Sequence, residues 1–259
     1  MIVASLHAQA GKTLLARAMT EYFVLSGKHP VIFDTDFSER RLCACFPYDA
    51  IVVDLNNVRG QMALFDTLAK PFDETRVVDV TPRSFRRFFN LMRDTDFVAE
   101  ARANRVEPVI LYIVDRNPES FEEGLELRER FPDCTFVVVG NAFLRPPRDS
   151  TRRTPGYRAL DAHDLHMVMP ALDPAFAGII EDPGLSLSDL IRQPLSLGRS
   201  RRARGDISFE AHAAVRAWLV RMFQEFHWVT QQVERRGLAF PAPVGLARQA
   251  MRSGRDAPN

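Results

Sequence analysis

The residues whose types and spacing suggest chemistry lie near the start of the chain. Leu6 to Thr13 reads Leu-His-Ala-Gln-Ala-Gly-Lys-Thr, between an apolar run at 2–6 and a run of helical spacing at 13–26. Gly-Lys-Thr in this context is suited to phosphate, because backbone N–H groups at a helix start attract an anion and the lysine adds positive charge. The full phosphate-loop pattern has a glycine where this chain has Leu6. The alternative interpretation is a surface turn with a solvated lysine.

Positioning such a loop requires a strand before it and a helix after it, and the rest of the chain repeats that alternation. Strands are predicted at 2–6, 31–34, 50–55, 76–80, 108–114, 134–140 and 165–169, and helices at 13–26, 60–68, 82–93 and 118–131. Continuous apolar strands separated by helices indicate a parallel sheet covered on both faces. The predicted fold is a doubly wound, mostly parallel α/β domain, with ligands outside the carboxyl ends of the strands.

The pattern changes after about residue 194. A nucleotide-binding domain is predicted at 1–195, a basic linker at 196–206, a long C-terminal helix at 207–240 and a flexible tail at 241–259. The helix is indicated by apolar residues recurring at three- and four-residue steps, from Val215 to Val233. We expect it to pack on the domain or on a partner.

Composition limits the class of protein. A chain of 259 residues with 46% hydrophobic residues can bury a sizeable α/β core, and a formal net charge of +1 favours no class of partner. Cys43, Cys45 and Cys134 match no zinc spacing, which predicts free thiols. The sequence has neither a secretory leader nor an apolar run of about 18 residues, so we expect a cytoplasmic location.

Further motifs resemble those of the ParA/MinD-type ATPases, which are P-loop proteins. Residues 27–36 read GKHPVIFDTD, similar to the family's second strand, which ends in Asp-x-Asp. Residues 48–54 (YDAIVVD) resemble its Walker B strand, and residues 137–141 (VVVGN) resemble the strand whose asparagine reads adenine. The resemblance covers residues 1–195 and is strongest over 1–60.

The resemblance implies a site for ATP or ADP with Mg²⁺. Lys12 would contact the phosphates, and Asp36 would orient the attacking water. Metal ligation would fall to Thr13, Asp34 and Asp54. The nucleotide would be surrounded by His7, Ala8, Gln9, Ala10, Gly11, Lys12, Thr13, Leu14, Asn141 and Pro170. Each polar residue also has a local alternative, since Asp34 and Asp36 could cap a turn and Asn141 could be a plain turn residue.

The chain departs from the family pattern at the loop itself. His7 stands where the family has a lysine that reaches the nucleotide of a dimer partner, and Ala8 and Gln9 replace paired glycines. The segment after Asp54 also lacks the family's usual prolines. These departures leave ATP hydrolysis and dimerisation open.

The resemblance also implies partners. A homodimer, a protein adaptor and nonspecific DNA contact through Arg199, Arg201, Arg202 and Arg204 are expected, with solvated surface charge as the alternative for the arginines. Membrane contact is not expected, because Glu225 and Glu234 dilute the basic face of the C-terminal helix.

The favoured hypothesis is an ATP-binding molecular switch in the partition or positioning of DNA or other cargo, or in conjugative plasmid transfer. Its ATP hydrolysis would be weak or stimulated by a partner. The alternative is a catalytically degenerate module that uses the fold for protein or DNA interaction. A kinase or other group-transfer enzyme is a third option, for which no acceptor residues can be assigned.

Overall fold

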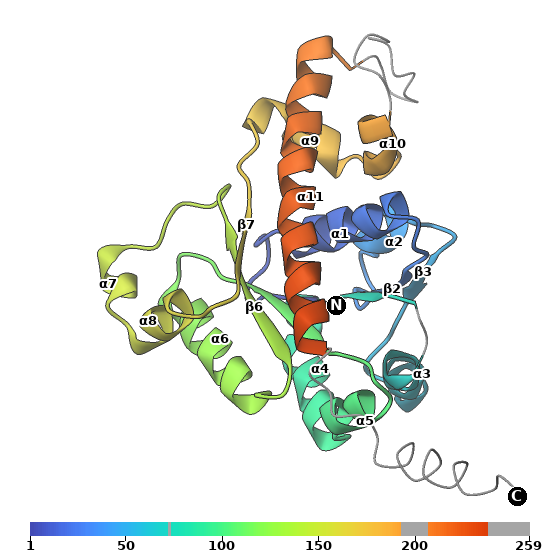
Figure 1. Cartoon of the computed structure of the whole chain (residues 1–259), viewed down its shortest axis with the longest axis vertical. Coiled ribbons are helices and arrows are strands. Elements are labelled where there is room, and N and C mark those ends of the chain that lie inside the picture. Colours follow the sequence, from blue (N-terminus) through green and yellow to red (C-terminus); the bar gives the residue numbers. More distant parts are fainter. Residues whose placement is uncertain (72–73, 193–206, 238–259) are drawn as a thin grey trace, which may run out of the picture.

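The core of the protein is a seven-stranded sheet in the order β3-β2-β4-β1-β5-β6-β7, with every neighbouring pair parallel (Figure 1). The structure, a computed structural model, describes residues 1–71, 74–192 and 207–237. The strands are β1 (Ile2–Ala4), β2 (Val31–Asp34), β3 (Ala50–Val52), β4 (Arg76–Asp79), β5 (Val109–Ile113), β6 (Thr135–Asn141) and β7 (His166–Met169). This confirms the predicted parallel α/β fold and places β1 between β4 and β5.

Helices cover both faces of the sheet. They are α1 (Lys12–Leu25), α2 (Arg41–Cys45), α3 (Val58–Ala69), α4 (Pro82–Asp94), α5 (Phe97–Ala103), α6 (Pro118–Arg130), α7 (Asp149–Arg152), α8 (Pro155–Asp161), α9 (Pro174–Glu181), α10 (Leu187–Arg192) and α11 (Phe209–Gly237). On one face α1, α9, α10 and α11 bury Val3 and Leu111, and on the other α3, α4, α5, α6 and α8 bury Ile2 and Ile110. Alternate residues of each strand therefore enter two separate cores.

Helix α1 has a glycine at each end. Gly11 precedes its first residue, and Gly27 follows its end at φ +78°. Lys28 N–H donates to the carbonyl of Phe23, and Gly27 N–H donates to that of Val24. This Schellman arrangement confirms the predicted helix end and directs the chain into β2.

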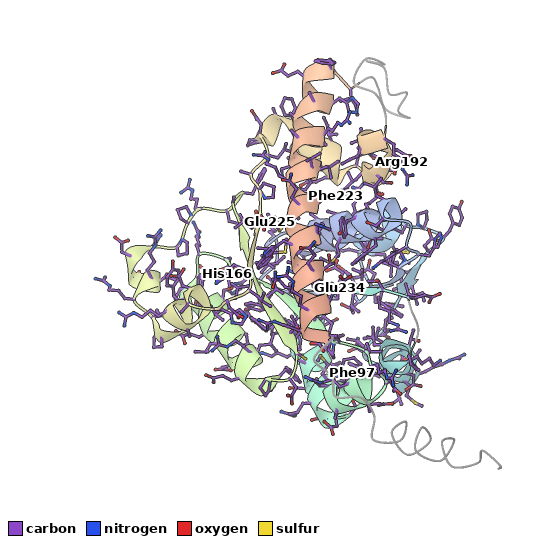
Figure 2. All side chains as sticks on the ribbon, in the orientation of Figure 1. Phe97, His166, Arg192, Phe223, Glu225 and Glu234 are labelled. Carbon is purple, nitrogen blue, oxygen red and sulfur yellow. The ribbon has the colours of Figure 1, made fainter. Side chains whose placement is uncertain are left out.

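The long helix α11 lies against α1 and the edge of the sheet formed by β7 (Figure 1). The indole Nε1 of Trp218 donates to the carbonyl of Pro170 over 2.6 Å, and Glu225 accepts from the backbone N–H of Val168 over 3.0 Å. Figure 2 shows Phe223 on the same helix, where its ring packs edge-on against Tyr22 of α1. The carboxylate of Glu225 thus accepts a hydrogen bond from a backbone N–H of the edge strand β7, which no described strand pairs with on that side.

The segment 171–192 is not one continuous helix. It forms α9 and α10, separated at Asp182, whose carboxylate accepts from the N–H of Gly184. Pro183 lacks the N–H that a continuous helix needs, and Gly184 favours a turn. The short helices α2 and α5 were also not predicted.

Two predicted segments lie outside the described residues. These are the basic linker 196–206, with Arg199, Arg201, Arg202 and Arg204, and the tail 241–259. The C-terminal helix is described to Gly237. Over the described ranges, no helix combines the length and the apolarity that crossing a membrane requires.

Candidate phosphate-binding site

The loop between β1 and α1 folds tightly at two left-handed residues. Gln9 has φ 61° and Gly11 has φ 101°. A side chain at Gly11 would place its Cβ 2.9 Å from Asn141 Nδ2 and 3.2 Å from Met169 Cε. Position 11 therefore requires glycine for both backbone conformation and space.

Lys12, the first residue of α1, is buried inside this loop. Its side chain is 7% exposed, and its Nζ donates to the carbonyl of His7 over 2.7 Å. Burial lowers the pKa of Lys12 to about 8, although the charges of Asp79 and Asp115 oppose the shift. The loop thus holds an amine at the N-terminus of a helix, which contradicts the interpretation of a solvated lysine on a surface turn.

Thr13 faces a carboxylate at the end of β4. Its hydroxyl donates to Asp79 Oδ2 over 2.6 Å, and Asp79 is 2% exposed. Burial raises the pKa of Asp79 to about 7; the Thr13 bond and Lys12 lower it, and Asp34 and Asp36 add to the rise. Among the described residues, Asp79 Oδ1 has no hydrogen-bond partner. A buried carboxylate oxygen without a hydrogen-bond partner fits a role as a cation ligand.

Asp54 does not lie at this position, so the expectation that its strand carries the metal-associated aspartate needs correction. It follows β3, which forms an edge of the sheet and is separated from β1 by β2 and β4. Its carboxylate accepts from Asn56 N–H over 2.9 Å and from Asn57 Nδ2 over 3.0 Å. Asp54 organises the turn before α3, and Asp79 is the aspartate beside Thr13.

Asp34 ends β2 and Asp36 follows it, and both carboxylates bond mainly to backbone. Asp34 is fully buried and accepts from the N–H groups of Asp36, Leu42 and Cys43. Burial raises the pKa of Asp34, against those three bonds. The structure therefore gives Asp34 the capping role at α2 that was the local alternative to metal ligation.

Asp36 is partly exposed beside this cap. Its Oδ1 accepts from Ser38 N–H, Ser38 Oγ and Glu39 N–H. Desolvation alone would raise the pKa of Asp36, but these bonds and the charge of Arg83 lower it below its ordinary value. Asp36 is therefore an ionised carboxylate at the carboxyl end of β2.

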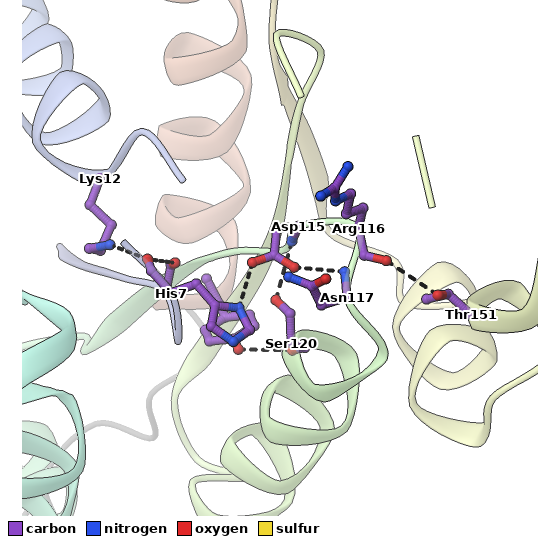
Figure 3. A network of polar contacts seen from close by, with 9 residues as sticks. His7, Lys12, Asp115, Arg116, Asn117, Ser120 and Thr151 are labelled. Carbon is purple, nitrogen blue, oxygen red and sulfur yellow. Dashed lines mark hydrogen bonds and ion pairs between the residues drawn. The ribbon is translucent and has the colours of Figure 1, made fainter. Parts of the chain in front are cut away.

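His7 forms a hydrogen bond that connects the loop to the end of β5. Its Nδ1 lies 2.6 Å from Asp115 Oδ2, and its carbonyl also accepts from Ser5 Oγ over 2.9 Å (Figure 3). Asp115 Oδ1 accepts from Asn117 N–H over 2.8 Å, so the carboxylate is held from both sides. The imidazole is oriented by Asp115, and the His7 carbonyl holds Lys12.

Asn141 and Pro170, predicted beside a base, support the loop and the helix α11. Asn141 Nδ2 donates to the Ala10 carbonyl and its Oδ1 accepts from Phe143 N–H, both over 2.9 Å. The Pro170 carbonyl accepts from Trp218. In this structure Asn141 therefore buttresses the phosphate loop.

The structure brings His7, Ala10, Gly11, Lys12 and Thr13 together. Ala8 and Gln9 are exposed on the loop, and Leu14 is half-buried. Sequence reasoning missed Asp79 and Asp115. A signal for Asp79 was present in the sequence. Val77-Val78-Asp79 ends an apolar strand and Pro82 follows closely, whereas the first proline after Asp54 is Pro71.

The residues beside Lys12 fit a magnesium–phosphate group. Mg²⁺ is usually held by hydroxyl and carboxylate oxygens together with substrate phosphates and water. Thr13 and Asp79 supply such oxygens. Within the described part of the chain, no group of at least three His, Cys, Asp or Glu residues could hold a metal alone. The donor set therefore suits a metal that arrives with phosphate.

These features define the class of fold. A central parallel strand, a Gly-Lys-Thr loop whose lysine is buried and a following helix form the phosphate loop of a P-loop NTPase fold.

Comparison with known proteins adds similarity of fold only. The chain is similar to the solved structure of the MinD cell division protein of Aquifex aeolicus, with 13% identity and a TM-score of 0.48 over 86% of this chain and 95% of that one. It is also similar to the septum site-determining protein MinD of Pyrococcus horikoshii OT3, solved with Mg-ADP, with 10% identity and a TM-score of 0.45 over 90% and 97%. No protein-family model and no curated protein matches the sequence.

Proposed function

We propose that the protein binds ATP and ADP with Mg²⁺ at the loop Leu6–Thr13 and acts as a nucleotide-dependent switch. The observation that carries this proposal is the bond between Thr13 and Asp79 beside the buried Lys12. In P-loop sites such a hydroxyl and carboxylate accompany Mg²⁺, and the lysine neutralises the outer phosphates. The solved relative with Mg-ADP is consistent with the same ligand here.

The chain's own residues would have separate tasks. Gly11 and the following N–H groups form the anion-binding helix start, and Lys12 exchanges its bond to the His7 carbonyl for phosphate oxygens. Thr13 and Asp79 would hold the metal, which supplies charge neutralisation between the phosphates. Asp36 would orient water, a role supported by its low pKa and its partial exposure at the carboxyl end of β2.

The switch would act in partition or positioning of DNA or other cargo, or in conjugative plasmid transfer, with weak or partner-stimulated hydrolysis. The segments following Asp36 and Asp79 become exposed at Phe37 and Arg83, so bound nucleotide would bias their conformation and thereby partner binding. A homodimer and a protein adaptor are the partners that we propose.

Calorimetry with ATP and ADP in the presence of Mg²⁺ tests the proposal. Wild-type protein should bind both, and Lys12→Ala should lose binding. Lys70→Ala is the matched control, because Lys70 is exposed after α3 and far along the chain from the loop. Absence of binding in wild-type protein would contradict the proposal.

A second candidate is a module that keeps the fold without using the site. It is favoured by the closed state of the loop, in which the His7 carbonyl accepts from both Ser5 and Lys12 and the ring is bound to Asp115. For Lys12 to contact phosphate, bound nucleotide must replace the hydrogen bond between Lys12 Nζ and the His7 carbonyl. Affinity that rises in Asp115→Asn would indicate that this closure opposes binding.

A further inference from the structure

Helix α4 begins shortly after Asp79 and carries three neighbouring arginines with different surroundings. Arg83 Nη1 donates to Ser38 Oγ over 3.2 Å, and Arg87 Nη1 donates to the Leu55 carbonyl over 3.0 Å. For the exposed Arg86, the structure shows no side-chain bond or ion pair with any described residue. Arg83 is therefore the arginine of this helix that reaches the segment after β2.

The segment that Arg83 contacts lies beside the candidate site. Ser38 Oγ donates to Asp36 over 2.8 Å, and the guanidinium of Arg83 is one of the groups that keep Asp36 ionised. Asp36 in turn lies near enough to Asp79 for its charge to act on that carboxyl. Arg83 is thus linked to the Thr13–Asp79 pair through a short run of charged groups.

The acidic side chains around the site favour an additional positive charge such as that of Arg83. Asp34, Asp36 and Asp79 gather at the carboxyl ends of β2 and β4, and β2 and β4 pair Asp34 with Asp79 in register. Each of these carboxylates repels a terminal phosphate more strongly than a shorter diphosphate, because the additional group extends toward the metal side. In the loop, Lys12 is the cationic side chain that can reach phosphate, because the His7 ring is bonded to Asp115.

We propose that Arg83 is a specificity-determining residue that distinguishes ATP from ADP by contacting the terminal phosphate. This inference rests on the proposed nucleotide site. Guanidinium groups bind phosphate through paired N–H donors, and the exposed side chain of Arg83 can leave Ser38 to do so. The exchange would also release Ser38 and couple the segment 36–40 to the terminal phosphate.

The test compares ATP and ADP binding by calorimetry, with Mg²⁺, in wild type, Arg83→Gln and Arg86→Gln. Arg83→Gln should weaken ATP binding by about tenfold or more, the scale of a lost hydrogen bond to a charged group, and leave ADP binding within about twofold. Arg86→Gln should change both by less than about twofold, because it removes the same charge from a neighbouring exposed position. Arg83→Lys should fall between wild type and Arg83→Gln.

Other outcomes distinguish a failure of the Arg83 proposal from a failure of the proposed nucleotide site. Equal weakening of ATP and ADP in Arg83→Gln, with an unchanged melting temperature, would overturn the role of Arg83 and indicate positioning of the 36–40 segment. A ratio of ATP affinity to ADP affinity that is the same in Arg83→Gln as in wild type would also overturn the role of Arg83. Ser38→Ala provides a further check, since it removes the resting contact and should preserve the preference for ATP. Failure of wild-type protein to bind either nucleotide would instead reject the proposed function.

Discussion

Thr13 and Asp79 join the start of α1 to the end of β4 through a hydrogen bond of 2.6 Å. These residues are distant in sequence and meet because β4 pairs directly with β1. Asp79 is buried and one of its oxygens has no partner among the described residues. The pair is therefore the part of the site with the clearest consequences for experiment.

The first prediction separates Asp79 from Asp54. In Asp79→Asn, we expect the Mg²⁺-dependent part of nucleotide affinity to fall by about tenfold or more, since a carboxylate beside the metal is lost. Asp54→Asn should retain it, because the Asp54 carboxylate bonds to Asn56 and Asn57 in the turn before α3. Titrations with and without Mg²⁺ measure both. A larger loss of Mg²⁺-dependent affinity in Asp54→Asn than in Asp79→Asn would show that Asp54, after β3, is the metal-associated aspartate.

The second prediction concerns stability against pH in the free protein. Burial raises the pKa of Asp79 from 3.8 to about 7, so between these values the folded protein holds a proton that the unfolded chain releases. Stability from this group is therefore lost as pH rises through that window, by at most about 1.4 kcal/mol per pH unit. Urea unfolding of wild type from pH 5 to about pH 7.5 should show the decline. Asp79→Asn should reduce this decline. An identical dependence of the free energy of unfolding on pH in both proteins would refute the raised pKa of Asp79.

The third prediction compares two glycines with positive φ. Gly11→Ala introduces a left-handed alanine and a contact of 2.9 Å with Asn141, whereas a Cβ at Gly27 has no atom within 4 Å. Gly27→Ala should cost about 1 kcal/mol of stability, from backbone strain. Gly11→Ala should cost about 1–3 kcal/mol more and should displace the loop. Denaturant unfolding measures the difference, and equal losses would show that Asn141 moves aside.

The fourth prediction uses the two tryptophans of α11. Trp218→Phe should lower the free energy of unfolding by about 2–4 kcal/mol, because it leaves a cavity and deprives the Pro170 carbonyl of its donor. Trp228 is 37% exposed, so Trp228→Phe should change stability by less than about 0.5 kcal/mol. Chemical unfolding followed by far-UV circular dichroism checks both variants. Similar effects would mean that the Trp218 bond contributes little.

The fifth prediction concerns the β7 edge. Glu225→Ala frees the N–H of Val168, whose side chain is 49% exposed, and should increase self-association through strand pairing. Glu234→Ala, in the same helix, is the control. Light scattering coupled to size-exclusion chromatography at rising concentration compares them. If Glu225→Ala and wild type elute alike at every concentration, the carboxylate does not protect this edge.

Local pattern was sufficient for much of the architecture. Apolar β-branched runs predicted each strand of the sheet, and helical spacing predicted α1 with its end near residue 26, because the burial pattern of side chains is encoded residue by residue. The position of Lys12 and Thr13 was predicted in the same way, since a strand, a Gly-Lys-Thr and a helix are contiguous in sequence.

Adjacency of strands was decided only by the tertiary structure. Both 50–54 (AIVVD) and 76–79 (RVVD) are apolar runs that end in aspartate, so sequence pattern alone could not tell which one pairs with β1. The crossovers of the sheet place β4 there, which brings Asp79 to Thr13 and leaves Asp54 at the edge. For the same reason the sequence by itself determined the loop, in which strand, Gly-Lys-Thr and helix are contiguous. The contacts of His7 with Asp115, Ala10 with Asn141 and Arg83 with Ser38 depended on how distant segments pack.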